Sequence, residues 1–357
     1  MKKVGIITIY DNNNYGNRLQ NYATQIFLER LGQYDVETIK NNANLSKPQK
    51  YSSLQLRKIK NLVIKMKKFN KRKLKLYKEF NKNINFNKKY FDYFKKSEYT
   101  QYNYYIIGSD QVWNPNYRLT YFDLAKFVES NNKISFSASF GISDFDASKN
   151  KSDFEKFKSI SVREDAGKKI IDDLNINKEV EVLIDPTMLL TAEEWDKVSK
   201  APKQISKLNG KKYILNYFLG NLSEERKKEI QRIATENECE IINILEKNDP
   251  FFISGPSEFL WLEKNAFLIC TDSFHSSVFA ILYNRPFVIF NREDKTKSMN
   301  SRIETLVSKF NLKNREYNGK NITQENLKHD YTEAYKILEQ ERIKSKKFLK
   351  SALDIDE

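Results

Sequence analysis

The sequence predicts an α/β protein built from two domains with parallel sheets facing a cleft. Short apolar segments alternate with amphipathic helical segments over most of the chain, and this alternation is typical of parallel sheets covered by helices. It pauses at a seam from Asp185 to Lys211, which holds Pro186, Pro202 and Gly210. At 357 residues the chain has room for two domains of roughly 100–200 residues each.

The first domain is expected to start with a buried strand and a helix. The apolar segment Val4–Tyr10 leads into a polar turn. Apolar residues between Leu19 and Leu31 then recur at three- and four-residue steps, which indicates one buried face of a helix. The other strands expected in this domain are Tyr104–Ile107, Lys133–Phe140, Ser159–Val162 and Val180–Ile184.

A second series of strands and helices follows the seam. Its expected strands lie near Tyr213–Leu219, Glu240–Leu245, Phe267–Thr271 and Phe287–Phe290. Its expected helices lie near Glu224–Glu236, Ser257–Lys264, Ser276–Tyr283, Ser301–Phe310 and Gln324–Leu349. We therefore predict an N-terminal domain at residues 1–190 with a helical insertion at about 47–100. We also predict a C-terminal domain at 191–322 and a terminal helix at 323–357. Packing of this helix against the N-terminal domain is one possible arrangement.

One segment carries the whole basic excess of the chain. The formal net charge is +15, yet residues 47–96 alone hold 18 Lys and Arg against two acidic residues, Glu79 and Asp92. Within this segment, apolar residues from Leu56 to Phe69 recur at helical spacing beside many lysines. Such a helix suits an anionic membrane surface, although packing of its apolar face on its own domain explains the pattern equally well. No nucleic-acid-binding motif accompanies the charge.

The composition excludes several other classes of protein. Hydrophobic residues make up 39% of the chain and aromatic residues 13%, which is too many for a disordered protein. No apolar run reaches the roughly 18 residues of a membrane helix. The two Cys and two His are scattered, unlike the ligands of a zinc site, and no carboxylate cluster indicates a metal. We expect a cytoplasmic protein without metal or cofactor, for which peripheral contact with the inner face of the cell membrane through residues 47–96 is one arrangement.

Ligands of open α/β sheets bind beyond the carboxyl ends of the strands, so the residues that follow strands are the first candidates. The turn after the first strand precedes a helix whose free N–H groups suit an anion or a sugar hydroxyl. A Trp beside Asp and Gln after another strand suits a sugar face, although the same residues form ordinary turns. The candidates for the cleft or for an acceptor are Asn14, Tyr15, Gly16, Asn17, Ser109, Asp110, Gln111 and Trp113.

Two further candidates carry charge or a proton. Arg163 directly follows an expected strand, where its planar guanidinium suits a carboxylate or phosphate, or else closes a surface turn. His275 lies between an expected strand and an expected helix, and histidine is well suited to proton transfer near neutral pH. Asp272 either orients His275 or caps the helix that follows.

Together these residues resemble the polysaccharide pyruvyltransferase family. The matching stretches occur in the family's order and are Asn14–Ala23, Ile107–Asn114, Ser161–Glu164, Asp185–Thr187 and Thr271–His275. The resemblance implies two Rossmann-like domains arranged as in GT-B glycosyltransferases. It also implies phosphoenolpyruvate as donor and, as acceptor, a sugar of a cell-surface polysaccharide or of its lipid-linked or nucleotide-linked precursor.

The resemblance also implies roles for single residues. His275 matches the family's proposed catalytic histidine, and Arg163 matches a donor-binding arginine. Better-known members carry an arginine where this chain has Ser273. This departure implies either a different donor or a different residue that binds the donor. Lys295 is similar in position to a donor-binding lysine of some members, and Arg302 could supply the missing charge. A GT-B glycosyltransferase that uses a nucleotide sugar is the alternative, followed by a non-catalytic scaffold of a glycan assembly complex.

Overall fold

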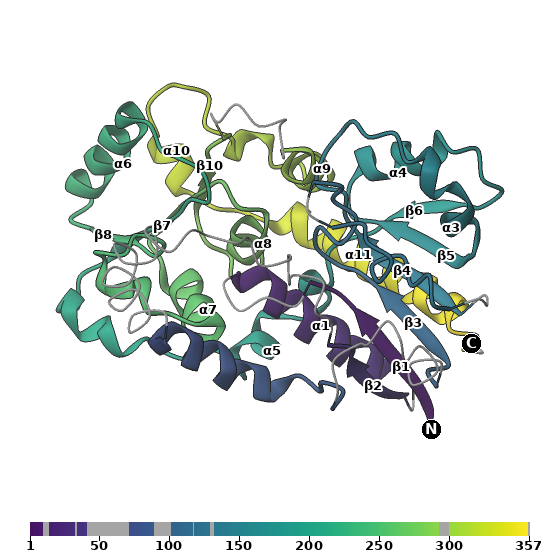
Figure 1. Cartoon of the computed structure of the whole chain (residues 1–357). Coiled ribbons are helices and arrows are strands. Elements are labelled where there is room, and N and C mark those ends of the chain that lie inside the picture. The colour runs from purple at the N-terminus through teal and green to yellow at the C-terminus, as the bar shows by residue number, and fades with distance from the viewer. Residues whose placement is uncertain are drawn as a thin grey trace, which may run out of the picture.

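The computed structural model describes residues 1–9, 14–32, 34–40, 71–88, 101–116, 118–128, 132–292 and 300–355. Within these ranges the chain forms two parallel sheets, each flanked by helices (Figure 1). The first sheet has six strands in the order β2-β1-β3-β4-β5-β6, and the second has four in the order β10-β9-β7-β8. The α/β fold predicted from the alternation of apolar and amphipathic segments is confirmed.

The N-terminal lobe, as we call the described residues up to 190, surrounds the six-stranded sheet. Its elements are β1 (Lys2–Ile7), α1 (Tyr15–Leu31), β2 (Tyr34–Thr38), a helix at 71–80, η1 (Asn81–Asn83), β3 (Tyr104–Ile107), β4 (Lys133–Ala138), η3 (Ser148–Asn150), α3 (Lys151–Glu155), β5 (Phe157–Val162), α4 (Asp165–Asp172), β6 (Val180–Val182) and η4 (Pro186–Leu189). Every residue of β3 and β4 is buried, as expected for parallel strands covered on both faces. All five predicted strands are present, and β2 is an additional edge strand.

The C-terminal lobe, residues 191–322, surrounds the four-stranded sheet. Its elements are α5 (Ala192–Asp196), η5 (Lys203–Leu208), β7 (Tyr213–Tyr217), α6 (Glu224–Glu236), β8 (Glu240–Asn243), η6 (Pro250–Phe252), α7 (Pro256–Asn265), β9 (Leu268–Thr271), α8 (Phe274–Leu282), β10 (Phe287–Ile289), α9 (Ser301–Lys309) and η7 (Lys313–Arg315). The predicted strands and helices of this lobe are confirmed. The predicted terminal helix is instead two helices, α10 (Gln324–Leu327) and α11 (Thr332–Ala352).

A shared hydrophobic core and the last helix hold the two lobes together. Tyr15 of α1 stacks on Phe259 of α7, with ring centroids 4.7 Å apart. Helix α11 crosses from the C-terminal lobe to the N-terminal lobe (Figure 1). There Arg342 donates hydrogen bonds to the carbonyl oxygens of Met188 and Leu190. The relative position of the lobes is therefore set by packing and not by a single linker.

The order of the strands places a ligand crevice at the carboxyl end of each sheet. The chain adds β2 on one side of β1 and then continues at β3 on its other side. In the second sheet it adds β8 on one side of β7 and then continues at β9 on the other side. Such reversal points are where open α/β sheets bind ligands. At the end of β3 the φ of Gly108 is +130°, and a Cβ there would lie 2.2 Å from the carbonyl oxygen of Phe136, so only glycine fits.

Of the basic segment 47–96, the structure describes residues 71–88. The apolar stripe predicted between Leu56 and Phe69 lies outside the described residues. The helix at 71–80 is fixed by a buried face that contains Lys73, Tyr77 and Phe80. Among the helices of the described ranges, none combines the length and the apolar character that crossing a membrane requires.

Lys73 is a buried cation whose removal should stabilise the protein. Its Nζ lies 4.5 Å from the ring centroid of Phe252 and 5.0 Å from that of Tyr15, and burial lowers its pKa from 10.5 to about 8. Between these two values the unfolded chain binds more protons than the folded chain, so the free energy of unfolding rises with pH across this window. Below it the folded state bears the full cost of the buried charge.

We therefore expect Lys73→Met to raise the free energy of unfolding at pH 7 by up to roughly 3 kcal/mol, since the pKa falls from 10.5 to about 8 and each pKa unit corresponds to about 1.4 kcal/mol. The gain should shrink as the pH rises from 8 toward 10.5. Urea unfolding at several pH values measures it, with the exposed Lys78 replaced by Met as the control. Equal curves for the two variants would contradict the prediction.

Candidate active site

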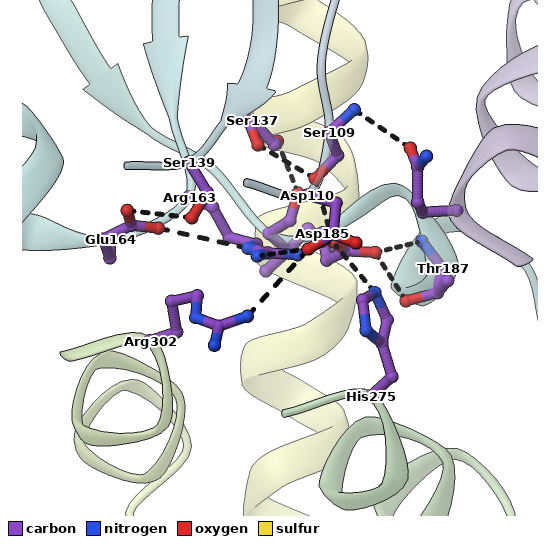
Figure 2. A network of polar contacts seen from close by, with 12 residues as sticks. Ser109, Asp110, Ser137, Ser139, Arg163, Glu164, Asp185, Thr187, His275 and Arg302 are labelled. Atoms are coloured by element: carbon purple, nitrogen blue, oxygen red, sulfur yellow. Dashed lines mark hydrogen bonds and ion pairs between the residues drawn. The ribbon is translucent and has the colours of Figure 1, made fainter. Parts of the chain in front are cut away.

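A buried carboxylate, that of Asp185, lies at the centre of a polar network between the two lobes (Figure 2). Asp185 precedes Pro186 and caps the short helix η4, where its Oδ1 accepts hydrogen bonds from the amide N–H of Thr187 at 3.0 Å and from its hydroxyl at 2.7 Å. Its Oδ2 accepts a hydrogen bond of 2.6 Å from Nη1 of Arg163 and lies 2.9 Å from the Ser109 hydroxyl oxygen. The side chain is thus fixed at both oxygens.

Burial alone would raise the pKa of Asp185. The neighbouring His275 outweighs this effect, together with Arg163 and the amide N–H of Thr187, and the pKa of Asp185 is held well below its ordinary value. Asp185 therefore remains ionised throughout the neutral range. A buried carboxylate of this kind attracts any cation that comes within contact distance.

Arg163 follows β5 directly and is surrounded by carboxylates. Besides its bond to Asp185, its Nη2 lies 3.4 Å from Oδ1 of Asp110 and its Nε lies 4.0 Å from Oε2 of Glu164. Burial would lower the pKa of Arg163, but these three carboxylates raise it above its ordinary value. The guanidinium also lies over the ring of Phe274, 4.4 Å from its centroid. The turn-closing arginine considered from the sequence is therefore excluded.

His275 is held between the lobes by a carboxylate on one side and a backbone on the other. Its Nε2 lies 3.7 Å from Oδ2 of Asp185, and its side chain points toward that carboxylate (Figure 2). A Cβ on Gly16, in the first turn of α1, would lie 2.1 Å from Nδ1 of His275. Glycine is thus required at position 16 for the imidazole to occupy its place.

Arg302 adds a second guanidinium to the network from the C-terminal lobe. It projects from α9 (Figure 2), and its Nη1 lies 3.9 Å from Oδ1 of Asp110, in the N-terminal lobe. Asp110 thus faces both Arg163 and Arg302. The network contains two guanidinium groups, one imidazole and the three carboxylates of Asp110, Glu164 and Asp185. The described parts of the chain contain no cluster of His, Cys and acidic residues suited to a metal ion.

Asp272 does not orient His275, and it does not cap α8. Its Oδ1 accepts a hydrogen bond from the amide N–H of Leu219 and its Oδ2 one from that of Gly220, both at 2.7 Å. Nε of Arg292 lies 3.0 Å from the same Oδ2. Both expectations for Asp272 are therefore corrected: it ties the loop after β7 to the end of β9, and Asp185 is the carboxylate that faces His275.

Two of the aromatic residues expected to face the cleft belong to the core instead. Trp113 is fully buried, packs edge-on against Phe154 with ring centroids 5.0 Å apart, and donates its indole N–H to the carbonyl oxygen of Asp123. Tyr15 is also fully buried, and its hydroxyl donates to the carbonyl oxygen of Ser254. Because no part of either ring is exposed, Trp113 does not present a sugar-binding face and Tyr15 does not face the cleft, and both predictions are wrong.

The remaining candidates within the described residues have mainly local contacts. Asn14 caps α1, where its side chain accepts a hydrogen bond from the amide N–H of Asn17 at 3.4 Å. Gln111 is buried and packs against Gly141. Ser273 lies at the start of α8, next to Phe274, and is buried. Lys295 lies outside the described residues.

Sequence reasoning missed several residues of this network. In the sequence, Asp185 belongs to the seam and to one matching stretch. An Asp before a Pro is typical of a turn, so the pattern indicates no further role for it. Ser137 donates its hydroxyl to the carbonyl oxygen of Ile184, and the side chain of Gln20 accepts a hydrogen bond from the amide N–H of Ser109. Neither residue type indicates a site in the sequence. Glu164 accepts three hydrogen bonds from residues 139–141. The sequence indicated it only as the last residue of the matching stretch Ser161–Glu164.

Comparisons with known proteins agree with this two-lobed arrangement. No curated protein matches the chain. Similar solved structures include UDP-GlcNAc 2-epimerase from Neisseria meningitidis bound to UDP-GlcNAc, with 10% identity, 100% of each chain covered and a TM-score of 0.50. Another is the S. aureus MnaA–UDP co-structure, with 11% identity, 100% of this chain and 98% of that chain covered, and a TM-score of 0.51. These likenesses concern the fold alone, which is GT-B-like.

The family comparison identifies the chain more closely. The model of the polysaccharide pyruvyl transferase family matches residues 14–294. This range covers most of the chain, including the first turn of α1, Arg163, Asp185 and His275. The chain therefore belongs to the polysaccharide pyruvyl transferase family and is a transferase.

Proposed function

We propose that the protein transfers the pyruvyl group of phosphoenolpyruvate to a sugar of a cell-surface polysaccharide or of its lipid-linked precursor. Family membership supplies the reaction class. The observation that carries the proposal is the buried imidazole of His275, which faces a carboxylate that also binds the guanidinium of Arg163. This arrangement brings a proton-transfer group and a cation for an anionic donor together at one point between the lobes.

The reaction requires the controlled movement of two protons. Forming the ketal breaks the bond between C2 of the donor and the phosphate oxygen, and it forms two bonds from C2 to sugar oxygens. The sugar loses two hydroxyl protons. One proton is gained by the methylene carbon, which becomes a methyl group, and the other leaves with phosphate. No oxidant or reductant is consumed.

We assign the proton transfer to the methylene carbon to His275. Its Nε2 lies 3.7 Å from Oδ2 of Asp185, so the imidazole faces this fixed carboxylate. General acid–base catalysis contributes about 10²–10⁴-fold to the rate. Asp185 would thus act as a positioning residue for the imidazole, while Gly16 provides the space for it.

We assign the donor's carboxylate and phosphate to Arg163 and Arg302. The contacts of these two guanidiniums with Asp110, at 3.4 and 3.9 Å, are long, whereas the bond from Arg163 to Asp185 is short. An anionic donor can therefore replace the contacts with Asp110 and leave Asp185 in place. Arg302 would supply the charge that Ser273 lacks. Asn14, Gly16, Asn17, Ser109, Asp110 and Gln111 remain the candidates for the acceptor side, and Lys295 remains a further donor candidate.

We also propose that the protein acts in the cytoplasm and contacts the inner face of the cell membrane through residues 47–96. The support is the charge of this segment and the location of lipid-linked sugars at a membrane. Anionic membrane surfaces attract basic segments within about one Debye length.

The first prediction of the proposed function concerns the donor. Wild-type protein should release phosphate from phosphoenolpyruvate only when a suitable lipid-linked or nucleotide-linked sugar is present. His275→Ala should reduce this release by at least about 10²-fold, because the proton-transfer group is lost. The matched control is His329→Ala, since His329 is exposed and should leave the rate unchanged.

Two outcomes would contradict this prediction. An equal loss of phosphate release in His275→Ala and His329→Ala would show that His275 has no specific role in the reaction. Absence of phosphate release with every acceptor, together with stabilisation by a nucleoside diphosphate and none by phosphoenolpyruvate, would favour a glycosyltransferase that uses a nucleotide sugar. The melting temperature with each compound measures that stabilisation.

The second prediction tests the space next to His275. Gly16→Ala should displace the imidazole, because the new Cβ would overlap its Nδ1. We expect kcat to fall roughly 10–100-fold, as for a displacement of about 1 Å of a catalytic group. Gly167→Ala, in α4, is the control, since its Cβ would meet Phe140, Val162 and Glu164 only at the ordinary contact distances of 3.4–3.5 Å. Full activity of Gly16→Ala would show that His275 need not occupy this position.

The third prediction separates the two carboxylates near His275. Asp185→Asn should lower kcat roughly 10–100-fold, because the carboxylate that binds Arg163 and faces His275 is lost and both side chains are free to shift. Asp272→Asn removes a carboxylate that binds other groups, so its kcat should stay near that of the wild type. A loss in Asp272→Asn with none in Asp185→Asn would reverse the assignment. Circular dichroism checks that both variants fold.

A further inference from the structure

A groove between the two lobes, apart from the network around Asp185, combines an apolar floor with a basic rim. It lies between the helix at 71–80 and residues 200–204 and 253–258 of the C-terminal lobe, and its volume is about 520 Å³. Leu76, Ala201 and Ile253 contribute apolar surface. The cationic residues that line it are Arg72, Lys75, Lys200 and Lys203, all of them exposed. Two of these come from the basic segment and two from the other lobe.

The basic residues outweigh the acidic ones in this groove. Its two acidic residues are Glu79 and Glu258. Glu79 is paired with Lys82, with Nζ 2.8 Å from Oε2, and the carboxylate of Glu258 accepts a hydrogen bond from the amide N–H of Gly255 at 2.9 Å. The charges of Lys75 and Lys200 also act on Glu79, and that of Lys200 acts on Glu258, so two carboxylates offset only part of the charge of four cations. The four cations consequently present a net positive field to a ligand in the groove.

The elements that carry these cations are fixed in place. The helix at 71–80 is held by its buried face, where the ring of Tyr77 stacks on that of Tyr15 with centroids 5.7 Å apart. On the other wall, the amide N–H of Lys200 donates to the carbonyl oxygen of Ser257, and the side chain of Gln204 donates to that of Ile253. A Cβ on Gly255 would lie 2.6 Å from the Cβ of Leu76, which shows how closely the walls meet at one end.

We propose that this groove binds the phosphate headgroup of an anionic membrane phospholipid, with the apolar floor against the first part of its acyl chain. The proposal deepens, and rests on, the membrane contact proposed above. The charge complementarity between the four cations and a phosphate favours such an occupant, and the apolar floor suits an amphiphile better than a small soluble anion. Because Lys200 and Lys203 lie outside residues 47–96, the proposal differs from attraction by the basic segment alone.

Co-sedimentation with vesicles tests the proposal. The vesicles contain phosphatidylcholine alone or mixed with phosphatidylglycerol, and the full-length protein is used. Lys200→Glu/Lys203→Glu should lower the partition into phosphatidylglycerol vesicles at least about tenfold, since each Lys near an anionic surface adds measurably to binding. The control with the same change in net charge is Lys346→Glu/Lys347→Glu, on the exposed side of α11, which should lower it less than about twofold. Lys200→Gln/Lys203→Gln should give an intermediate loss.

Three outcomes would overturn the proposal. They are absence of wild-type binding to phosphatidylglycerol vesicles, equal loss in the two double variants, and full displacement from vesicles by millimolar glycerol 3-phosphate, which would indicate a site for a soluble phosphate. Phosphate release with a water-soluble acceptor should be unchanged in Lys200→Glu/Lys203→Glu. That second measurement separates a failure of the groove from a failure of the proposed reaction, and melting curves show that the variants fold.

Discussion

The candidate site depends on one buried negative charge, the carboxylate of Asp185. Taking a carboxylate out of water is costly unless cations and hydrogen-bond donors compensate it. Here the compensation comes from Thr187 on the same turn, from Ser109 and Arg163 at the ends of other strands, and from His275 in the other lobe. The chain must therefore bring the ends of β3, β5 and β6 and the start of α8 to one point. The position of His275 follows from this requirement.

Packing between the lobes fixes this point from the other side. The first turn of α1 approaches His275 closely because residue 16 has no side chain, and the next residues of α1 are buried. Tyr15 stacks between the helix at 71–80 and α7. Aromatic stacking of this kind adds roughly 0.5–1.5 kcal/mol beyond the burial of area. The imidazole is thus placed by elements of both lobes, as the proton transfer proposed for His275 requires.

The sequence predicted the strands well, because buried parallel strands are continuous apolar runs. It did not predict β2, an edge strand whose sequence, Tyr34–Thr38, is only partly apolar and partly buried. It also did not predict which side chains after a strand face the cleft and which enter the core. Trp113 and Asp110 lie three residues apart after the same strand, yet one enters the core and the other meets two guanidiniums. Periodicity shows which side chains of a helix or strand are buried. A turn after a strand has no such period, so which of its side chains face the cleft is known only from the structure.

The balance of charge in the network limits how the proposed donor can bind. A donor with a carboxylate and a phosphate brings about three negative charges near neutral pH. The network already holds three carboxylates against two guanidiniums, so the proposed donor must compete with these carboxylates for the guanidiniums. Arg163 is bound closely by Asp185, whereas the contacts of Arg163 and Arg302 with Asp110 are longer. The proposed donor would therefore displace Asp110 from the two guanidiniums before it displaces Asp185 from Arg163.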